Sequence, residues 1–365
     1  MTLSITPLHK WIDTQKDPLI ISGPCGAETE EQIMQTAFGL AALNRVHVFR
    51  AGVWKPRTRP NSFEGAGSKA LPWLSRVKKE TGMLTAVEVA NAGHAEEALK
   101  HGIDILWIGA RTTVNPFSVQ EIADALKGTD AAVMVKNPVH SDIQLWIGAL
   151  ERINQAGITK LVAVHRGFYT PDESVYRNIP RWEIPIELKT LYPQLPLICD
   201  PSHICGRRET LAGVAQKALD LNMAGLMIEA HHDPSAALSD AGQQLTPAAL
   251  GWLLSGLQIR EVASQDKVFK DKLEQMRLII DDIDAQLIHI LAKRMEVITQ
   301  IGEYKRDNNV TVFQLERWLE ILRSRIASGI IQGLDETYVK EVCELLHKES
   351  IRLQTEIMEI KKLNS

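Results

Sequence analysis

Eight short apolar segments of this chain each end at a residue that can bind a charge or a metal ion. In chain order these residues are Cys25, Arg50, Glu88, Arg111, Lys136, Arg166, His203 and Glu229. Arginine and lysine side chains pair with carboxylate and phosphate oxygens, whereas thiolate, imidazole and carboxylate groups are metal ligands. Four cations and three potential metal ligands in equivalent positions predict an enzyme that acts on anionic substrates.

The candidate metal ligands form a mixed set. They are Cys25 in Gly-Pro-Cys-Gly-Ala-Glu, His203 in Asp-Pro-Ser-His, Glu229 at the end of an apolar segment, and Asp240 in the loop that follows. One thiolate, one imidazole and two carboxylates suit a divalent transition ion such as Mn, Fe, Co or Zn, and the set does not choose among them. His231 and His232 are rival ligands, but adjacent strand residues point to opposite faces, so one site cannot use both. Packing within a loop is the simpler explanation for that pair.

The cations gather at or just after the ends of the same segments. They are Arg50, Lys55, Arg57, Arg111, Lys136 and Arg166. Because like charges brought together must be offset by bound anions, this set predicts either a phosphorylated acid or two phosphorylated substrates at once. Next to a divalent metal, such a site could polarise a carbonyl group while it holds phosphates nearby.

The elements that must position these residues are buried strands. The apolar runs are 19–25, 46–52, 83–89, 105–110, 131–137, 161–167, 197–203 and 225–232, and helix-like segments separate them. Continuous apolar runs that alternate with helices are typical of parallel strands covered on both faces. Eight such units in roughly 250 residues predict a (β/α)8 TIM barrel, whose chemistry lies at the C-terminal ends of the strands.

The bulk properties exclude several classes of protein. The chain has 365 residues and a formal net charge of -4, which argues against a broad nucleic-acid surface. Its four cysteines show neither a CxxC pair nor the framework of a small secreted domain. We find no signal-peptide core at the N-terminus and no apolar run near the ~18 residues of a membrane span. We therefore expect a cytoplasmic protein with small-molecule substrates and neither nucleic-acid nor membrane partners.

The pattern changes after the eighth apolar run, which predicts a barrel domain at 1–262, a linker at 263–269 and an all-helical domain at 270–365. Apolar residues spaced by three and four predict a first helix from about 270 to about 305, ~50 Å long. Because the helical domain at 270–365 is too small to be as wide as this helix is long, we expect the helix to pack against a second chain in a homodimer. Two further helices follow at about 313–328 and 335–363, separated by Gly329 and Gly333.

The barrel motifs resemble 3-deoxy-D-arabino-heptulosonate 7-phosphate (DAHP) synthase of the type I-beta kind, a metal-dependent transferase that opens the shikimate pathway of aromatic amino acid biosynthesis. They are Gly23-Pro-Cys-Gly-Ala-Glu28, Arg50 with Lys55-Pro-Arg-Thr58, Ile108-Gly-Ala-Arg111, Lys136-Asn-Pro138, His165-Arg-Gly167, Asp200-Pro-Ser-His203, and Glu229 with Asp240. The resemblance implies that Cys25, His203, Glu229 and Asp240 hold the metal.

The same resemblance implies the substrate contacts. Phosphoenolpyruvate would be held by Arg50, Lys55, Arg111, Lys136 and Arg166, with Lys136 also catalytic, and erythrose 4-phosphate by Arg57 and Thr58. The implied reaction joins C3 of phosphoenolpyruvate to the sugar aldehyde, after which water adds at C2 and phosphate leaves. Glu88 and Asp200 would position that water or relay protons. A related synthase uses arabinose 5-phosphate, but its loop carries Lys-Ala-Asn-Arg where this chain has Lys55-Pro-Arg-Thr58, which favours erythrose 4-phosphate.

The helical domain resembles the all-helical chorismate mutases, which are isomerases, over about residues 268–360. The residues that carry the resemblance are Arg277, Arg294, Lys305, Arg317, Ser350 and Gln354. It implies that Arg294, Lys305 and Gln354 are catalytic, that Ser350 and Arg317 bind chorismate, and that Arg277 serves the site of the partner chain. Two positions depart from the family: Trp318 stands where glutamate is common, and Gln314 where aspartate is frequent. The missing glutamate would bond the substrate hydroxyl, so the departure bears on mutase activity.

These motifs lead to one main hypothesis, a bifunctional enzyme with a DAHP synthase barrel and a chorismate mutase domain. In the competing interpretation, the helical domain is a non-catalytic sensor of chorismate or prephenate that dimerises the barrel. A third keeps the barrel reaction with arabinose 5-phosphate as the sugar. If the synthase is feedback-regulated, the helical domain is the expected allosteric receiver, and removal of residues 265–365 would leave an active synthase without that response.

Overall fold

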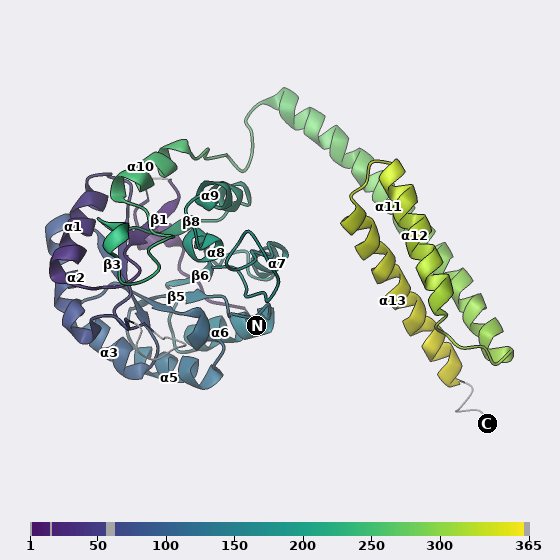
Figure 1. Ribbon diagram of the computed structural model, residues 1–365, viewed down its shortest axis with the longest axis horizontal. Helices are drawn as coiled ribbons and strands as arrows, with labels where there is room; N and C mark the ends of the chain where they lie inside the picture. Colours follow the sequence, from purple (N-terminus) through teal and green to yellow (C-terminus); the bar gives the residue numbers. More distant parts are fainter. Residues whose placement is uncertain (1, 15–16, 56–62, 361–365) are drawn as a thin grey trace. The chain divides into compact units, whose positions relative to one another are not determined.

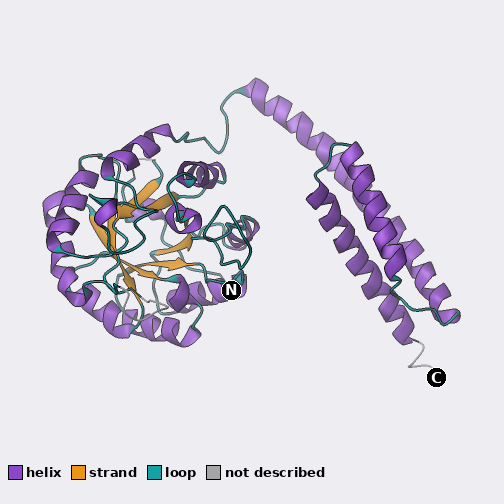
Figure 2. Cartoon of the chain, in the orientation of Figure 1, coloured by secondary structure: helices purple, strands orange, loops and turns teal. Residues whose placement is uncertain are grey.

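We analysed a computed structural model of the chain, which describes residues 2–14, 17–55 and 63–360. The chain divides into two compact units, Met1–Val262 and Ala263–Ser365. Each unit is described by itself below. Figures 1 and 2 show the strands at the centre of the first unit, with helices around them, and only helices and loops in the second.

The first unit is a closed parallel barrel, which confirms the predicted fold class. Its strands are β1 (Leu19–Gly23), β2 (Val48–Ala51), β3 (Leu84–Val89), β4 (Ile105–Ile108), β5 (Ala132–Lys136), β6 (Leu161–His165), β7 (Leu197–Cys199) and β8 (Gly225–Glu229). Each strand pairs with the next, and β1 closes the barrel on β8, with Ile21 opposite Met227. The C-terminal ends of all eight strands therefore lie on the same face of the barrel.

Helices connect the strands. They are α1 (Glu30–Ala41), α2 (Leu71–Thr81), α3 (Ala92–Lys100), α4 (Ala110–Thr113), α5 (Pro116–Leu126), α6 (Ile143–Gln155), α7 (Glu183–Leu191), α8 (Pro201–Cys205), α9 (Leu211–Asp220) and α10 (Pro247–Gly256). Short 3-10 turns lie at Leu8–Lys10, Gly67–Ala70 and Pro234–Ala236.

Most of the predicted strand segments end earlier than the apolar pattern indicates, and two of them continue as a short helix. After β7 the chain enters α8, because Pro201 occupies the first helical position and the Asp200 side chain accepts a hydrogen bond from the His203 amide. After β4 it enters α4, which begins beyond Gly109. His203 and Arg111 therefore lie on short helices at the barrel mouth rather than on strands.

Two apolar cores explain why the strands read as continuous apolar runs. One core fills the barrel, with Ile21, Trp107 and Met134 among its members. The other lies between the strands and the outer helices, and Ile20, Leu106 and Val133 belong to it. Neighbouring residues of one strand thus point into different cores, so both must be apolar.

The second unit consists of three helices, α11 (Lys267–Asp307), α12 (Leu315–Ile331) and α13 (Glu336–Ile360). The first helix begins three residues before the predicted start, because Asp266 caps the amides of Val268 and Phe269. The second continues through Gly329, which the sequence analysis had placed in a connecting segment. A Cβ at Gly329 would lie 2.5 Å from Val339 of α13, so this glycine permits close helix packing. The turn instead uses Gly333, whose φ is +81°.

A long apolar stripe of α11 is exposed within a single chain. Ile279, Ile283, Leu287 and Ile290 are each more than half exposed. Among the helices that the structure describes, none is long and apolar enough to cross a membrane.

Candidate active sites

A cavity of about 570 Å³ opens at the C-terminal ends of the barrel strands. Its charged and imidazole-bearing lining residues are Lys55, Glu88, Arg111, Lys136, His140, Arg166, Arg177, His203 and Asp240. Five of the eight residues predicted from the strand ends therefore line one space, whereas Cys25, Arg50 and Glu229 are buried and do not line it. Arg57 and Thr58, which were predicted to bind the sugar phosphate, lie outside the described residues.

Cys25 is fully buried and contacts two residues that line this cavity. Its thiol donates a hydrogen bond to Oδ2 of Asp240 at 3.1 Å, and Nζ of Lys55 donates to Sγ of Cys25 at 2.8 Å. Burial, followed by the charge of Glu229, raises the pKa of the Cys25 thiol to about 12. The close backbone packing around Cys25 requires glycine at two positions. A Cβ at Gly52 would lie 2.3 Å from the Cys25 carbonyl oxygen, and a Cβ at Gly23 would lie 2.1 Å from the Arg50 carbonyl oxygen.

Glu229 is fully buried at the end of β8 between a cation and an imidazole. Its Oε1 lies 3.3 Å from Nη2 of Arg50 and 3.8 Å from Nε2 of His203, while Oε2 accepts a hydrogen bond from Gln243 at 2.6 Å. No described residue donates a hydrogen bond to Oε1. Burial alone would raise the pKa of this carboxyl, but His203 and Arg50 outweigh burial and lower it.

Asp200 links two predicted functional residues beneath the cavity. Its Oδ2 accepts from Nζ of Lys136 at 2.6 Å and lies 2.8 Å from Nδ1 of His203. Burial opposes ionisation, yet His203 and Lys136 hold the pKa of Asp200 well below its ordinary value. These two contacts of Asp200 turn Nε2 of His203 toward Glu229 and hold Lys136 at the cavity.

Arg50 and Lys136 share an aromatic neighbour inside the barrel. The Arg50 guanidinium carbon is 4.8 Å and Lys136 Nζ is 5.8 Å from the centre of the Trp107 ring. Cation–π attraction at these distances helps to hold both cations under the cavity.

The two remaining predicted arginines, Arg166 and Arg111, line the same cavity. Arg166 is held by Asn178, which accepts from Nη1 at 2.7 Å, and by Asn137, which accepts from its backbone amide at 2.7 Å. Desolvation lowers the pKa of Arg166 to about 10. Arg111 is exposed on α4 at the cavity entrance.

Sequence analysis missed Arg177 and Gln243. Arg177 donates to Oδ1 of Asp240 at 2.9 Å and to Gln243 at 3.0 Å, and Gln243 in turn bonds Glu229. Both residues lie in long loops after β6 and β8, where no apolar periodicity marks their direction. The only available signal was for Gln243, which lies three positions after Asp240 in the sequence.

The four predicted metal ligands stand as two pairs in this structure. Cys25 contacts Asp240, and His203 lies near Glu229. Within the described residues, no three His, Cys, Asp or Glu side chains are already grouped as a metal site. The donor types nevertheless fit a divalent transition ion, and Oε1 of Glu229 retains an unused lone pair next to His203.

The rival histidines have other contacts. His231 and His232 stack on each other with ring centres 4.6 Å apart, and Nε2 of His231 lies 3.7 Å from Glu28. Nδ1 of His231 accepts from the Asp233 amide at 3.0 Å, as expected for loop packing.

A second group of predicted residues converges between α11 and α13. Nη1 of Arg294 donates to Oγ of Ser350 at 2.9 Å, and Nε2 of Gln354 donates to the Ser350 carbonyl oxygen at 3.2 Å. Lys305 donates to the Val312 carbonyl oxygen at 2.7 Å. A Cβ at Gly302 would lie 3.2 Å from Gln354, so the absence of a side chain there lets α13 approach α11 closely.

Arg277 and Arg317 do not join this group within one chain. Both are about two-thirds exposed and pair with glutamates of their own helices, Glu274 at 3.8 Å and Glu320 at 2.7 Å. Arg277 lies seventeen positions before Arg294, which corresponds to about 25 Å along a helix. It therefore cannot reach the Arg294 group of its own chain.

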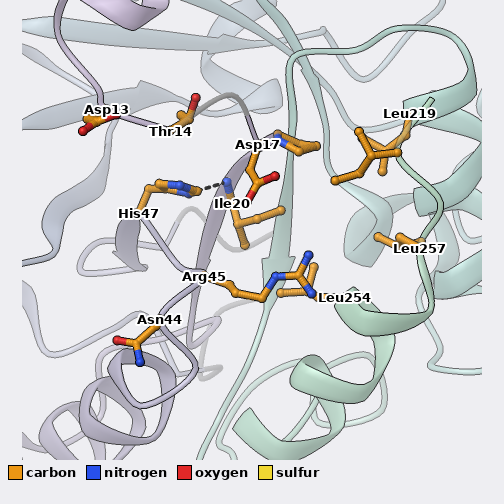
Figure 3. Close-up of a pocket in the computed structure, with 12 residues that line it drawn as sticks. Asp13, Thr14, Asp17, Ile20, Asn44, Arg45, His47, Leu219, Leu254 and Leu257 are labelled. Atoms are coloured by element: carbon orange, nitrogen blue, oxygen red, sulfur yellow. Dashed lines mark hydrogen bonds between the residues drawn. The ribbon is translucent and has the colours of Figure 1, made fainter. Parts of the chain in front are cut away.

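A smaller cavity of about 160 Å³ lies at the opposite, N-terminal ends of β1 and β2 (Figure 3). Asp17 and Arg45 stand beside Leu254 and Leu257 there, and the Ile20 amide donates to Nδ1 of His47 at 3.1 Å. None of the predicted site residues lines it. In this fold the N-terminal face serves stability rather than catalysis.

The fold and the mouth of the first unit define a (β/α)8-barrel protein with a cation-rich site for anionic ligands. Comparison with known proteins is more specific: the family model described as "DAHP synthetase I family" matches residues 5–262, and the chain belongs to this family. The model described as "Chorismate mutase type II" matches residues 276–355, so one chain fuses the two domains. Both resemblances stated from the sequence are confirmed. Members of the first family generally depend on a divalent metal ion.

Individual relatives agree with this assignment. A phospho-2-dehydro-3-deoxyheptonate aldolase of Thermotoga maritima is 33% identical over 226 residues, which are 62% of this chain and 64% of the relative. The chain thus spans less than two thirds of that relative's length. A crystal structure of a Thermotoga maritima protein with the same description, also called DAHP synthase, matches with a TM-score of 0.61 and 28% identity over 69% of this chain and 71% of that one. The T-protein of Haemophilus influenzae is 28% identical over 82 residues, 22% of each chain.

Proposed function

We propose that the barrel condenses phosphoenolpyruvate, erythrose 4-phosphate and water to DAHP and inorganic phosphate, and that the helical unit rearranges chorismate to prephenate. The observation that carries the first activity is the convergence of Lys55, Arg111, Lys136 and Arg166 on one cavity at the C-terminal strand ends. The convergence of Arg294, Ser350 and Gln354 carries the second.

In the barrel, the cations bind the carboxylate and phosphate of phosphoenolpyruvate. Arg166 is oriented by two asparagines and can present its fork to one anionic group, while Lys136 donates to the same ligand from below. Asp200 stays ionised between Lys136 and His203, so it can accept a hydrogen bond from the water that adds at C2, while its lowered pKa makes it a weak proton acceptor. Glu88 lines the cavity directly and is the alternative acceptor.

Cys25, His203, Glu229 and Asp240 would hold the divalent ion, which when bound supplies a Lewis acid that polarises the sugar aldehyde. Arg177 and Gln243 hold the two carboxylates in place, through Asp240 at 2.9 Å and Glu229 at 2.6 Å. Lys55 donates to the Cys25 sulfur and stabilises negative charge there.

In the helical unit, Arg294 and Lys305 would stabilise the negative charge that develops on the ether oxygen during the rearrangement. We also propose a homodimer through this unit. The exposed apolar stripe of α11 needs a covering surface, and Arg277 can serve a mutase site only in a partner chain. A cytoplasmic location agrees with four free cysteines.

The deciding experiment measures chorismate consumption by the purified full chain, with prephenate as the monitored product. Turnover that Arg294→Ala abolishes would establish the mutase activity. For the barrel, phosphoenolpyruvate consumption is compared with erythrose 4-phosphate and with arabinose 5-phosphate as the second substrate. Faster consumption with arabinose 5-phosphate would refute the proposed sugar.

One observation favours the sensor as an alternative to the mutase. Trp318, which replaces the glutamate common in the resembled family, stacks over His347 at the proposed site. In that case the full chain would bind chorismate or prephenate without turnover, and the barrel would be its only catalyst.

A further inference from the structure

His347 of α13 is held by an aromatic stack in the helical unit. Its ring lies 3.9 Å from the ring of Trp318 on α12, with 14° between the planes, and Phe313 approaches at 5.9 Å in a tilted arrangement. An imidazole packed on a broad flat face has little freedom to rotate. The ring nitrogens form no hydrogen bond with any other residue that the structure describes, so they remain available to a ligand.

The groups that face His347 belong to the proposed mutase site. Arg294 and Lys305 of α11 both act on its charge, and Ser350, one helical turn further along α13, bonds Arg294 at 2.9 Å. Burial, Arg294 and Lys305 together lower the pKa of His347, so its imidazole is neutral near pH 7. A neutral imidazole has one donor and one acceptor nitrogen, unlike the surrounding cations, which can only donate.

A second polar group of this site also lacks a partner. Gln354 is only 5% exposed, and its Oε1 accepts no hydrogen bond from the residues of known placement. The site therefore holds two cations for negative charge, an amide with an unused acceptor, and a fixed neutral imidazole. This combination fits a ligand that carries carboxylates together with a hydroxyl group.

We infer that His347, oriented by Trp318, is a further substrate-positioning residue that accepts a hydrogen bond from the ring hydroxyl of chorismate. The inference rests on the proposed function of the helical unit. It also explains how the chain can lack a carboxylate at position 318: the acceptor has moved from α12 to α13, and the residue at 318 supports it. A carboxylate at this place would partly cancel the attraction of the two cations for the dicarboxylate substrate. A neutral acceptor leaves that attraction undiminished.

The test compares His347→Phe with His347→Gln in the full-length chain. Phenylalanine keeps a flat ring against Trp318 but removes the acceptor, whereas glutamine restores an acceptor without the ring. We expect His347→Phe to lower kcat/KM for chorismate about tenfold, the size of one lost hydrogen bond, and His347→Gln to recover most of that loss. Lys348→Ala changes the next, exposed residue of the same helix and should leave turnover unchanged.

A ligand-side control separates hydrogen bonding from packing. A chorismate analogue without the ring hydroxyl should bind the wild type and His347→Phe with equal Kd, measured by calorimetry, whereas prephenate should bind the variant about tenfold more weakly. A variant that consumes chorismate and binds prephenate as the wild type does would overturn the inference but leave the proposed mutase intact. A wild-type chain that neither consumes chorismate nor binds prephenate would overturn both. If it binds without turnover, the two Kd values decide on His347 alone.

Discussion

Two Lys–Asp pairs of nearly equal length allow the contribution of burial at the barrel site to be measured. Lys136 and Asp200 are 2.6 Å apart, with 5% and 0% of their side chains exposed. Lys160 and Asp130 are 2.5 Å apart, with 26% and 90% exposed. The perturbation is the same in both: Asp200→Asn and Asp130→Asn remove one negative charge and keep the shape of the side chain.

The expected losses differ widely. Asp200→Asn leaves a buried lysine without its counter-charge, which costs about 3–5 kcal/mol of unfolding free energy. Asp130→Asn removes an exposed ion pair and should cost at most about 1 kcal/mol. With an m-value of about 3 kcal/mol/M in urea, the first loss lowers the unfolding midpoint by about 1–1.7 M.

Tryptophan fluorescence during urea titration is a suitable assay, because seven of the eight tryptophans lie before residue 263 and report on the barrel. The pH supplies a second arm. Since the folded pKa of Asp200 lies below its unfolded value, its contribution is complete above the ordinary carboxyl pKa of about 3.9 and declines as the pH falls below it. The gap between wild type and Asp200→Asn should therefore narrow in acid. Equal midpoint losses in the two variants at pH 7 would refute the argument from burial.

Three other outcomes are expected. Gly23→Ala should lower the barrel's unfolding midpoint strongly in a urea titration, because the new methyl would lie 2.1 Å from a backbone oxygen at a φ of +149°, whereas Gly213→Ala in α9 meets nothing within 4 Å and should leave the midpoint unchanged or raise it slightly. Titration of the metal-free chain with Mn²⁺ or Zn²⁺ should release close to one proton per ion from the Cys25 thiol, seen as a dependence of the calorimetric enthalpy on the buffer, and Cys25→Ser should reduce it. A chain ending at residue 262 should keep synthase activity and lose any response to chorismate or prephenate; unchanged inhibition would exclude the helical unit as the receiver.

The barrel could be predicted from the sequence because its two apolar cores leave a direct record. Ile20 and Ile21 point into different cores and both must be apolar, so eight such runs specify eight strands buried on both sides. Strand ends were less predictable. The apolar pattern continues through Pro201 to His203, but a proline and an aspartate cap turn that stretch into a helix.

The candidate site divides in the same way. Arg50 and Lys136 could be predicted because the C-terminal ends of all strands in a closed parallel barrel lie on the same face. Arg177 could not, since its loop returns to Asp240 through contacts that no sequence period records. In the sequence, Trp318 appeared only as the absence of a common glutamate. The stack of Trp318 on His347 indicates which residue takes over the role of that glutamate.

The charge of the barrel cavity limits the ligands it can hold. Of the described residues that line it, five are arginine or lysine and two are carboxylates, and the buried Asp200 pairs with one of the five, Lys136, which leaves two positive charges without counting the histidines. Glu229 lies below, but it is already engaged by Arg50 and His203. The cations of the cavity wall therefore have no full complement of protein anions. A single monoanion would leave part of this charge unbalanced, whereas a phosphate group would neutralise it. The electrostatics thus favour phosphorylated ligands over singly charged ones.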